Sequence, residues 1–468
     1  MRFRVAYALG VSVVVGAAGL VAAPAHAKAP AGAYDFDGDG RRDLALGSPD
    51  GTVGKRAAAG FVTVVYGAKG GPDARRRQVI TQATSGVPGA PEAGDRFGAS
   101  LASADFDRDG YADLAIGAPG EDSAKKNVGT VTILWGSKSG LRGATAWGEG
   151  RTAKAGNRFG EALAAGDLQG DGRPELFATI PGTSTFTWLT FSGRKASVRA
   201  GGTSKFDVNR SWIATGDVNG DGRGDVVYGW YDHDDPQVKH RRGFTLFKGT
   251  AGGGLTRDKT VYTTVHALAV GDFDGDRRAD VAVGDTYDSP WNGGSVTVHR
   301  GSPFGLGGTY TLHQNSSGVP GVASVEDNFG HSLAAGDVNG DGRADLAVGA
   351  PKADSGRVFD AGRAVVLYGS PSGLTGRGSQ AIGRSTAGVP GAPRAYEYFG
   401  AQVSLLDHNG DGRADLTAGT PNLNAPEGGV TTVLATKTGL TPNSATVLTP
   451  RTLGIPNRKA NLGATLGG

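Results

Sequence analysis

A nine-residue acidic pattern, Asp-x-Asp-Gly-Asp-Gly-x-x-Asp in its fullest form, recurs along this chain and has the residue types of a cation site. We call its copies the acidic loops and number their positions from one to nine. The seven copies start about 50 to 70 residues apart, at 35–43, 105–113, 167–175, 217–225, 272–280, 337–345 and 407–415. Alternate positions carry carboxylates, the hard oxygen ligands that Ca²⁺ prefers. One acidic turn could simply be solvated, but seven in register indicate metal binding.

The chemistry of the acidic loops predicts calcium rather than magnesium. Ca²⁺ takes about six to eight oxygen ligands in flexible geometry, whereas Mg²⁺ demands octahedral geometry and keeps its waters. Side chains at positions one, three, five and nine and the carbonyl at position seven would supply the oxygens, and glycines permit the tight turn. We therefore expect up to seven Ca²⁺ ions. The predicted ligands are Asp35, Asp37, Asp39, Arg41 and Asp43; Asp105, Asp107, Asp109, Tyr111 and Asp113; Asp167, Gln169, Asp171, Arg173 and Glu175; Asp217, Asn219, Asp221, Arg223 and Asp225; Asp272, Asp274, Asp276, Arg278 and Asp280; Asp337, Asn339, Asp341, Arg343 and Asp345; and Asp407, Asn409, Asp411, Arg413 and Asp415.

The acidic loops are not equivalent in their ligands. The third has Gln169 and Glu175 at positions three and nine, with Pro174 beside them, and we predict that it binds calcium most weakly. The fourth, sixth and seventh loops have asparagine at position three. Arg108 in the second loop and Arg277 in the fifth stand where the other loops have glycine.

Each acidic loop is flanked by short strand patterns. Phe-Gly precedes several loops, at 97–98, 159–160, 329–330 and 399–400, and Gly-Ala-Pro or a relative follows, at 47–49, 117–119, 349–351 and 419–421. Alternating apolar segments come next, such as 61–66, 130–135, 295–299 and 363–368, and a weaker segment such as 77–82 closes the unit. Four antiparallel strands per repeat are typical of a propeller blade.

Phe-Gly, the acidic loop and Gly-Ala-Pro together resemble the FG-GAP repeats of integrin α-subunit propellers and their bacterial relatives. The resemblance covers essentially the whole chain after its first residues. It implies an all-β fold, a seven-bladed β-propeller of four-stranded antiparallel blades, in a secreted bacterial member of the family. The fourth and fifth repeats depart from the pattern, with residues 211–213 (Ser-Trp-Ile) and 266–268 (His-Ala-Leu) in place of Phe-Gly.

The two ends of the chain are predicted to complete one blade. The first acidic loop begins at Asp35, with no room for a Phe-Gly strand before it. Residues 462–468 (LGATLGG) are similar to residues 97–103 (FGASLAS) and could supply that strand. The resulting single domain spans 28–468, with the first blade shared between about 34–82 and 461–468. A frayed C-terminal tail is the alternative.

The first 27 residues read as a secretory signal peptide. Arg2 and Arg4 precede an apolar segment at 5–22, and residues 25–27 (Ala-His-Ala) fit a signal peptidase site with cleavage after Ala27. An uncleaved membrane anchor is the alternative. No other segment is long and apolar enough to cross a bilayer, so we expect a secreted, extracellular protein with no membrane span in the mature chain.

Composition narrows the class of protein further. The 81 glycines show no Gly-X-Y period, which excludes collagen, and recurring apolar segments argue against disorder. The chain has no cysteine, so disulfides, thiolate zinc sites and a cysteine nucleophile are excluded. A secreted chain without disulfides needs another source of stability, and metal ions can provide it.

Bound calcium would also change the charge of the chain. Lys and Arg number 48 against 45 Asp and Glu, so the ions would leave it markedly positive. Anionic partners such as cell-wall polymers or nucleic acid would then be favoured, and the alternative is scattered, solvated surface charge. We expect a monomer.

Aromatic residues gather after the second strands of the fourth and fifth repeats. We predict a ligand face there, opposite the acidic loops, formed by Trp230, Tyr231, Tyr287 and Trp291. Exposed aromatics of this kind stack on sugars or anchor protein contacts. Packing between blades is the equal alternative.

The function predicted from these features is binding rather than catalysis. The sequence has no nucleophile elbow, phosphate loop, HExxH or dinucleotide motif, and its histidines are scattered. By family resemblance we expect a binding or adhesion module for a protein or a glycan. The alternatives are a calcium-dependent lectin and a secreted hydrolase with its site over the central channel.

Overall fold

Short runs of Val, Ile, Leu and Thr, bounded by glycine-rich turns, form the strands of this protein. The computed structural model describes residues 30–150, 153–203, 208, 210–231, 242–287, 290–456 and 459–468. Within these ranges the strands form seven four-stranded antiparallel sheets and one two-stranded hairpin. The predicted signal peptide at 1–27 lies outside the described residues. In the part of the chain that is described, no helix has the length and apolar character needed to cross a membrane.

Six of the blades use four strands that follow one another in the sequence. They are β4 (Ser100–Ala104), β5 (Asp113–Ala118), β6 (Thr130–Trp135) and β7 (Arg142–Gly148); β8 (Leu163–Gly166), β9 (Glu175–Ile180), β10 (Thr185–Ser192) and β11 (Lys195–Thr203); β12 (Arg210–Gly216), β13 (Asp225–Tyr231), β14 (Arg242–Gly249) and β15 (Leu255–Val261); β16 (Ala267–Gly271), β17 (Asp280–Asp285), β18 (Ser295–Ser302) and β19 (Gly305–Leu312); β20 (Ser332–Gly336), β21 (Asp345–Ala350), β22 (Arg363–Tyr368) and β23 (Thr375–Ile382); and β24 (Val403–Leu406), β25 (Asp415–Thr420), β26 (Gly429–Val433) and β29 (Thr446–Leu448).

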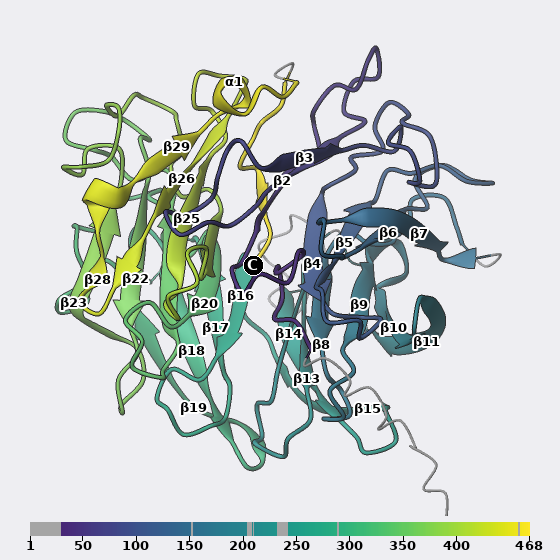
Figure 1. Ribbon diagram of the computed structural model, residues 1–468. Helices are drawn as coiled ribbons and strands as arrows, with labels where there is room; N and C mark the ends of the chain where they lie inside the picture. The colour runs from purple at the N-terminus through teal and green to yellow at the C-terminus, as the bar shows by residue number, and fades with distance from the viewer. Residues whose placement is uncertain are drawn as a thin grey trace, which may run out of the picture.

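The first blade joins the two ends of the chain. Its sheet has the order β3 (Arg77–Ile80), β2 (Phe61–Val65), β1 (Leu44–Ser48) and β30 (Thr465–Leu466). Leu46 lies opposite Leu466 in this antiparallel pairing, and the purple and yellow ends of the chain lie side by side (Figure 1). The predicted closure by the C-terminal strand is therefore confirmed. It leaves β1 without a free inner edge.

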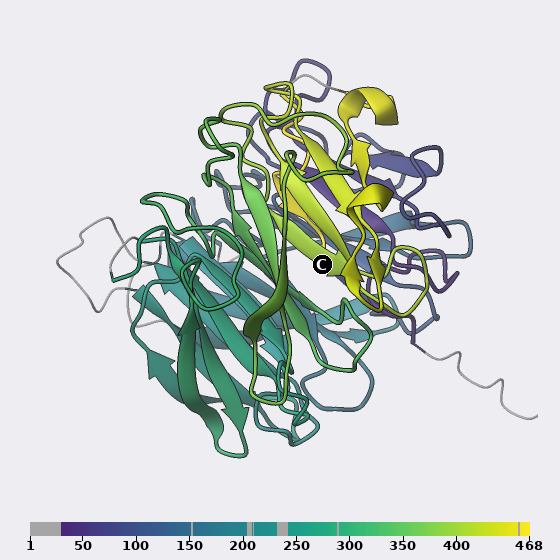
Figure 2. The same ribbon diagram turned by 90° about the vertical axis from the view of Figure 1, so that its left-hand side faces the viewer.

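The seven blades follow one another around the ring in chain order. Figure 2 shows this succession from teal through green to yellow. The innermost strands of neighbouring blades contact each other, while the second strands, such as β5 and β21, are buried along their whole length. Apolar residues from adjacent blades share common clusters. Short additional elements are the hairpin of β27 (Ala435–Thr436) and β28 (Gly439–Leu440), the 3₁₀ turns Pro181–Thr183 and Pro442–Ser444, and α1 (Pro450–Leu453).

The repeated glycines allow adjacent blades to approach closely. A Cβ added to Gly47 would lie 2.1 Å from the carbonyl oxygen of Gly98 in the next blade, and Gly117 faces Gly160 in the same way. The glycine of Gly-Ala-Pro therefore packs against the glycine of the following Phe-Gly. Thr179 occupies this position in the third blade, whose successor lacks Phe-Gly. The fourth and fifth repeats still form complete four-stranded blades.

Candidate metal sites and the opposite face

Each acidic loop directly precedes the second strand of its blade. In six blades it connects the innermost strand to that second strand, whereas the innermost strand of the first blade, β30, comes from the C-terminus. The carboxylate at position one organises the turn, because its oxygens accept the amides of positions five and six. For Asp35 these bonds come from Asp39 at 3.0 Å and Gly40 at 3.1 Å. The amide of position five also donates to the side chain at position three, and that of position seven to the side chain at position five. Carboxylates at alternate positions are thus turned toward a common centre.

Two arginines confirm that the loop backbone requires glycine-like conformations. Arg108 and Arg277 stand at glycine positions and have φ values of 60° and 68°. These lie in the left-handed region, which costs a side-chain-bearing residue roughly 1–2 kcal/mol. The turn geometry is therefore kept in the second and fifth loops despite the substitutions.

Three acidic loops bring three carboxylates together. In each, one oxygen from each of positions one, three and five lies within 4.8 Å of the others. Oxygens bound to one Ca²⁺ at about 2.3–2.6 Å are separated by at most such a distance, so these groups fit the ion. The groups are Asp35, Asp37 and Asp39; Asp105, Asp107 and Asp109; and Asp272, Asp274 and Asp276.

The loops with asparagine at position three keep the same turn. The amide oxygen of Asn339 accepts the amide of Asp341 at 2.9 Å, as Asp37 does with Asp39. The nitrogen of Asn339 donates to the carboxylate of Asp341 at 3.4 Å. The fourth and seventh loops, with Asn219 and Asn409, have the same pair of bonds. Calcium binding in these three loops stays a prediction.

The position-nine carboxylate is buried and bonded to the backbone. Asp43 is fully buried, and its oxygens accept the amides of Phe36 at 2.9 Å and Gly67 at 2.8 Å. Asp113 repeats this arrangement with Phe106 and Gly136. Position nine therefore ties the loop to the end of the third strand, and it lies outside the three converging groups. Burial raises the pKa of Asp43 to about 8, and a nearby cation would favour its charged form.

The third acidic loop has a different set of contacts. The side-chain nitrogen of Gln169 donates to the Glu175 carboxylate at 3.3 Å, and the other Glu175 oxygen accepts the Leu168 amide at 2.9 Å. In the third loop the Gln169 amide and the Glu175 carboxylate therefore bond each other, whereas the full loops have aspartates that converge on one centre. These contacts are those expected of the weakest site, although calcium occupancy stays a prediction.

Arginines outside the loops hold the position-three aspartates. Arg76 bonds Asp37 at 2.7 Å, Arg194 bonds Asp107 at 2.7 Å, and Arg300 bonds Asp274 at 2.8 Å. Arg76 and Arg194 lie between the third and fourth strands of a blade, and Arg300 lies within the third strand β18. The loops with three converging carboxylates are thus the ones supported by such an arginine.

Backbone hydrogen bonds join most neighbouring acidic loops to one another. The amide at position eight donates to the position-one carbonyl of the adjacent loop, for example from Ala279 to Asp217 at 2.8 Å. The third loop has Pro174 at position eight, and proline has no N–H to donate toward Asp105. The other bonds among the described residues run from Arg42 to Asp407, Ala112 to Asp35, Gly224 to Asp167, Ala344 to Asp272 and Ala414 to Asp337.

The four predicted aromatic residues do not form one surface. Trp230 is only 1% exposed and packs between the third and fourth blades, near Phe186 and Trp188. The prediction of a ligand-facing Trp230 is therefore wrong, because its position on β13 turns the indole into the inter-blade core. Tyr231 lies half-buried at the end of the same strand.

The other two aromatics are exposed but have neighbours. Tyr287 is 45% exposed and meets the ring of His266 edge-on at 5.4 Å, with Arg242 on its face. Trp291 is 40% exposed and stacks on His313 with the ring centroids 4.1 Å apart. Both keep an open surface that a ligand could contact.

A cavity of about 710 Å³ lies on the face opposite the acidic loops. We call it the central pocket, because most of its lining comes from the starting ends of the innermost strands of six blades. Its ionisable lining residues are Arg96, Arg158, Glu161, Arg210, His266 and His331. Sequence reasoning missed this pocket, although basic residues directly before two Phe-Gly pairs, Arg96 and Arg158, were a usable signal.

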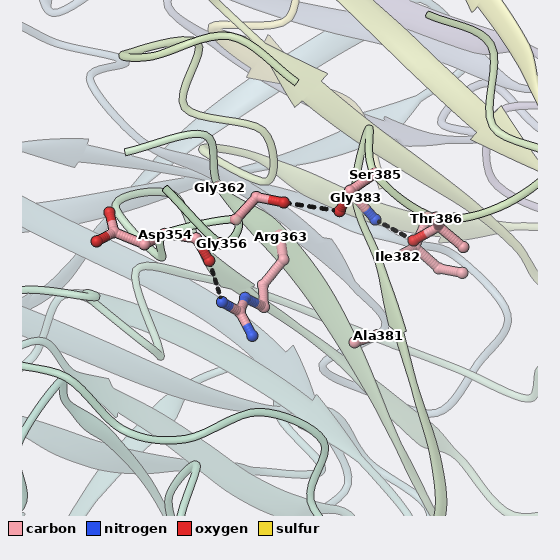
Figure 3. Close-up of a pocket in the computed structure, with 10 residues that line it drawn as sticks. Asp354, Gly356, Gly362, Arg363, Ala381, Ile382, Gly383, Ser385 and Thr386 are labelled. Atoms are coloured by element: carbon pink, nitrogen blue, oxygen red, sulfur yellow. Dashed lines mark hydrogen bonds between the residues drawn. The ribbon is translucent and has the colours of Figure 1, made fainter. Parts of the chain in front are cut away.

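A second, smaller cavity of about 220 Å³ lies beside β22 and β23 (Figure 3). Its polar groups bond one another: the Ser355 and Ser385 hydroxyls are 2.8 Å apart, and the Gly383 amide donates to Thr386 at 3.0 Å. The Arg363 guanidinium donates to the Asp354 carbonyl at 2.5 Å. With these groups already paired, the cavity offers less to a ligand than the central pocket.

Comparison with known proteins agrees with this architecture. The FG-GAP repeat family matches residues 29–65, 97–134 and 329–367. Integrin alpha pat-2 of Caenorhabditis briggsae is 31% identical over 271 residues, which are 54% of this chain and 21% of the integrin. Phosphatidylinositol-glycan-specific phospholipase D of Rattus norvegicus is 32% identical over 31% of this chain and 17% of its own length. Integrin alpha-IIb of Mus musculus is 34% identical over 39% of this chain and 17% of the integrin. The matches therefore span about a fifth or less of these relatives.

Proposed function

Because the chain is an integrin-α-like β-propeller of FG-GAP repeats, we propose that it is a secreted, calcium-stabilised binding or adhesion module for an extracellular protein or glycan. It acts as a monomer in this proposal. In this proposal the calcium ions stabilise the propeller, and the ligand binds to the face opposite the acidic loops. The matched relatives include integrin α chains, which supports a binding role.

The observation that carries the proposal is the convergence of three carboxylates in each of three acidic loops. These loops also bond their neighbours at the same end of the blades. Ions held there would neutralise the clustered carboxylates and fix the ends of the inner strands. The opposite face would then be held rigid, which lowers the entropic cost of binding a ligand there.

The composition of the central pocket favours binding over hydrolysis. Glu161 is the one carboxylate among its described lining residues. Glycoside hydrolysis generally needs two carboxyl groups across the scissile bond, roughly 5 to 9.5 Å apart. A hydrolase with its site over the central channel is therefore the less supported alternative.

Ligand capture by the calcium-loaded protein tests the proposal. The protein is applied to arrays of neutral and acidic glycans, including cell-wall polymers, and to immobilised extracellular proteins. We expect a ligand that is retained in calcium, lost on chelation and recovered when calcium is restored. Competition by a free sugar would identify a lectin, and competition by a protein fragment alone would identify protein adhesion. Turnover of ester or glycosidic substrates with no stable ligand would contradict the proposal.

Fractionation of the producing cells tests the location. We expect the protein in the medium with an N-terminus at Lys28. Recovery in the membrane fraction with residues 1–27 retained would establish the anchored alternative instead.

A further inference from the structure

The central pocket gathers positive charge where the innermost strands begin. Arg96 and Arg158 stand directly before Phe-Gly in the second and third blades, and Arg210 is the first residue of β12. His266 and His331 directly precede β16 and β20. All five line the same cavity of about 710 Å³. Residues from five consecutive blades thus converge on one site.

The acidic residues near the pocket offset only part of this charge. Arg158 pairs with Glu161 at 3.0 Å, and Arg96 lies 3.5 Å from Asp50. Arg210 is exposed and forms no ion pair with any residue in the described ranges. Burial raises the pKa of Glu161, and the neighbouring guanidiniums, first Arg158 and then Arg210, act against that rise. Among the described lining residues of the pocket, cations therefore outnumber anions.

The two histidines add neutral hydrogen-bonding groups. Burial lowers the pKa of His266 to about 4, with His331 and Arg210 adding to the effect, and the pKa of His331 is lowered as well. Both imidazoles are thus neutral near pH 7, when each has one donor and one acceptor nitrogen. The half-buried Trp212 and the amide of Gln402 also line the cavity. An indole face and neutral polar groups are the contacts that a sugar ring and its hydroxyls require.

We propose that the central pocket binds an acidic sugar, whose carboxylate or phosphate group is held by Arg210 together with Arg158. A guanidinium fork matches either oxyanion with two parallel hydrogen bonds. The cavity volume falls within the range that encloses a small ligand, roughly 300–1,000 Å³. This assignment rests on the proposed binding function and names the ligand class for one site of that module.

Calorimetric titration of the calcium-loaded full chain tests the assignment with four probes: glucuronate, glucose 6-phosphate, glucose and inorganic phosphate. We expect the two acidic sugars to bind roughly tenfold or more tightly than glucose, because charged hydrogen bonds would be lost with the neutral sugar. The tighter of the two identifies the oxyanion. Equal binding of glucose overturns the role of charge, and phosphate binding as tight as glucose 6-phosphate overturns the role of the sugar.

Two substitutions place the ligand in the pocket. Arg210→Gln should weaken the acidic sugars roughly tenfold without changing the melting temperature. Glu161→Gln should tighten them, because Arg158 no longer pairs with a competing carboxylate. Arg142→Gln, an exposed arginine on the outermost strand β7, is the control and should change neither property. Acidic-sugar binding that Arg210→Gln leaves unchanged overturns the proposal.

Failure of the acidic-sugar assignment can be distinguished from failure of the proposed binding function. If none of the four probes binds while the arrays still yield a calcium-dependent ligand, the pocket assignment is wrong and the binding module stands. If the arrays yield no ligand and substrate turnover is found, the proposed function itself is wrong.

Discussion

The backbone amide of Arg42 donates to the carbonyl oxygen of Asp407 at 2.8 Å. This bond joins the first acidic loop to the seventh across the seam where the ring closes. The buried His408 ring reinforces the seam, since its Nδ1 lies 2.8 Å from the Arg42 carbonyl oxygen. The seam is thus secured at the loop face by this bond and along the inner edge by β30.

Calcium removal should lower the melting temperature by many degrees. The ion binds the folded loops, so each site adds stability as RT ln(1 + [Ca²⁺]/Kd), about 2.7 kcal/mol at a hundredfold excess over Kd. Calorimetry with and without a chelator measures the change, and restored calcium should reverse it more fully than magnesium. Unchanged melting of protein shown to be metal-free would contradict a structural role for calcium.

The first and third acidic loops should differ in their response to mutation. Asp37→Ala removes a converging carboxylate and leaves Arg76 without its 2.7 Å partner, so it should lower both melting temperature and bound calcium. Gln169→Ala removes an amide that bonds Glu175, and should change the calcium count little. Metal analysis together with melting curves measures both. An equal loss of calcium in the two variants would show that the third loop is a full site.

Deletion of residues 460–468 should open the ring. It removes β30 and exposes the inner edge of β1, and it also removes the bond from the Ser404 hydroxyl to the Gly467 carbonyl at 3.0 Å. Exposed strand edges promote aggregation. Light scattering and thermal unfolding measure the outcome. A truncated chain that stays monomeric and melts like the parent would show that the closure contributes little.

Alanine substitution should lower stability strongly at Trp230 and only slightly at Trp291. Trp230→Ala leaves a cavity between the third and fourth blades and should cost about 3–5 kcal/mol of unfolding free energy. Trp291→Ala removes a side chain that is 40% exposed and should change stability little, since its main contact is a stacked His313. Denaturant unfolding of both variants measures this. Equal stability of the two would contradict the buried placement of Trp230.

The repeats allowed the fold to be predicted from the sequence, but the contacts between distant repeats could not be predicted from it. The spacing of the acidic loops and the likeness of 462–468 to 97–103 were enough to predict seven blades and their closure. The backbone bonds of Asp43 were not apparent, because its partner Gly67 comes from the far end of the next hairpin. The exposure of Trp230 was mispredicted because strand register, which decides the face of a side chain, cannot be read from composition. The central pocket was not apparent either, because its lining comes from six blades and its three arginines from the second, third and fourth of them.

The close approach of Gly47 to the next blade gives the last prediction. A Cβ at this position would lie 2.1 Å from the Gly98 carbonyl oxygen and 2.9 Å from Thr465 of the closing strand. Neither neighbour can move without shifting a strand, so Gly47→Ala should cost about 1–3 kcal/mol. Gly70→Ala, in a turn of the same blade, meets nothing within 4 Å. It should stay within about 1 kcal/mol of the parent and is the matched control. Unfolding curves for the two variants decide the matter, because equal stability would mean that the repeated glycine is not required for blade packing.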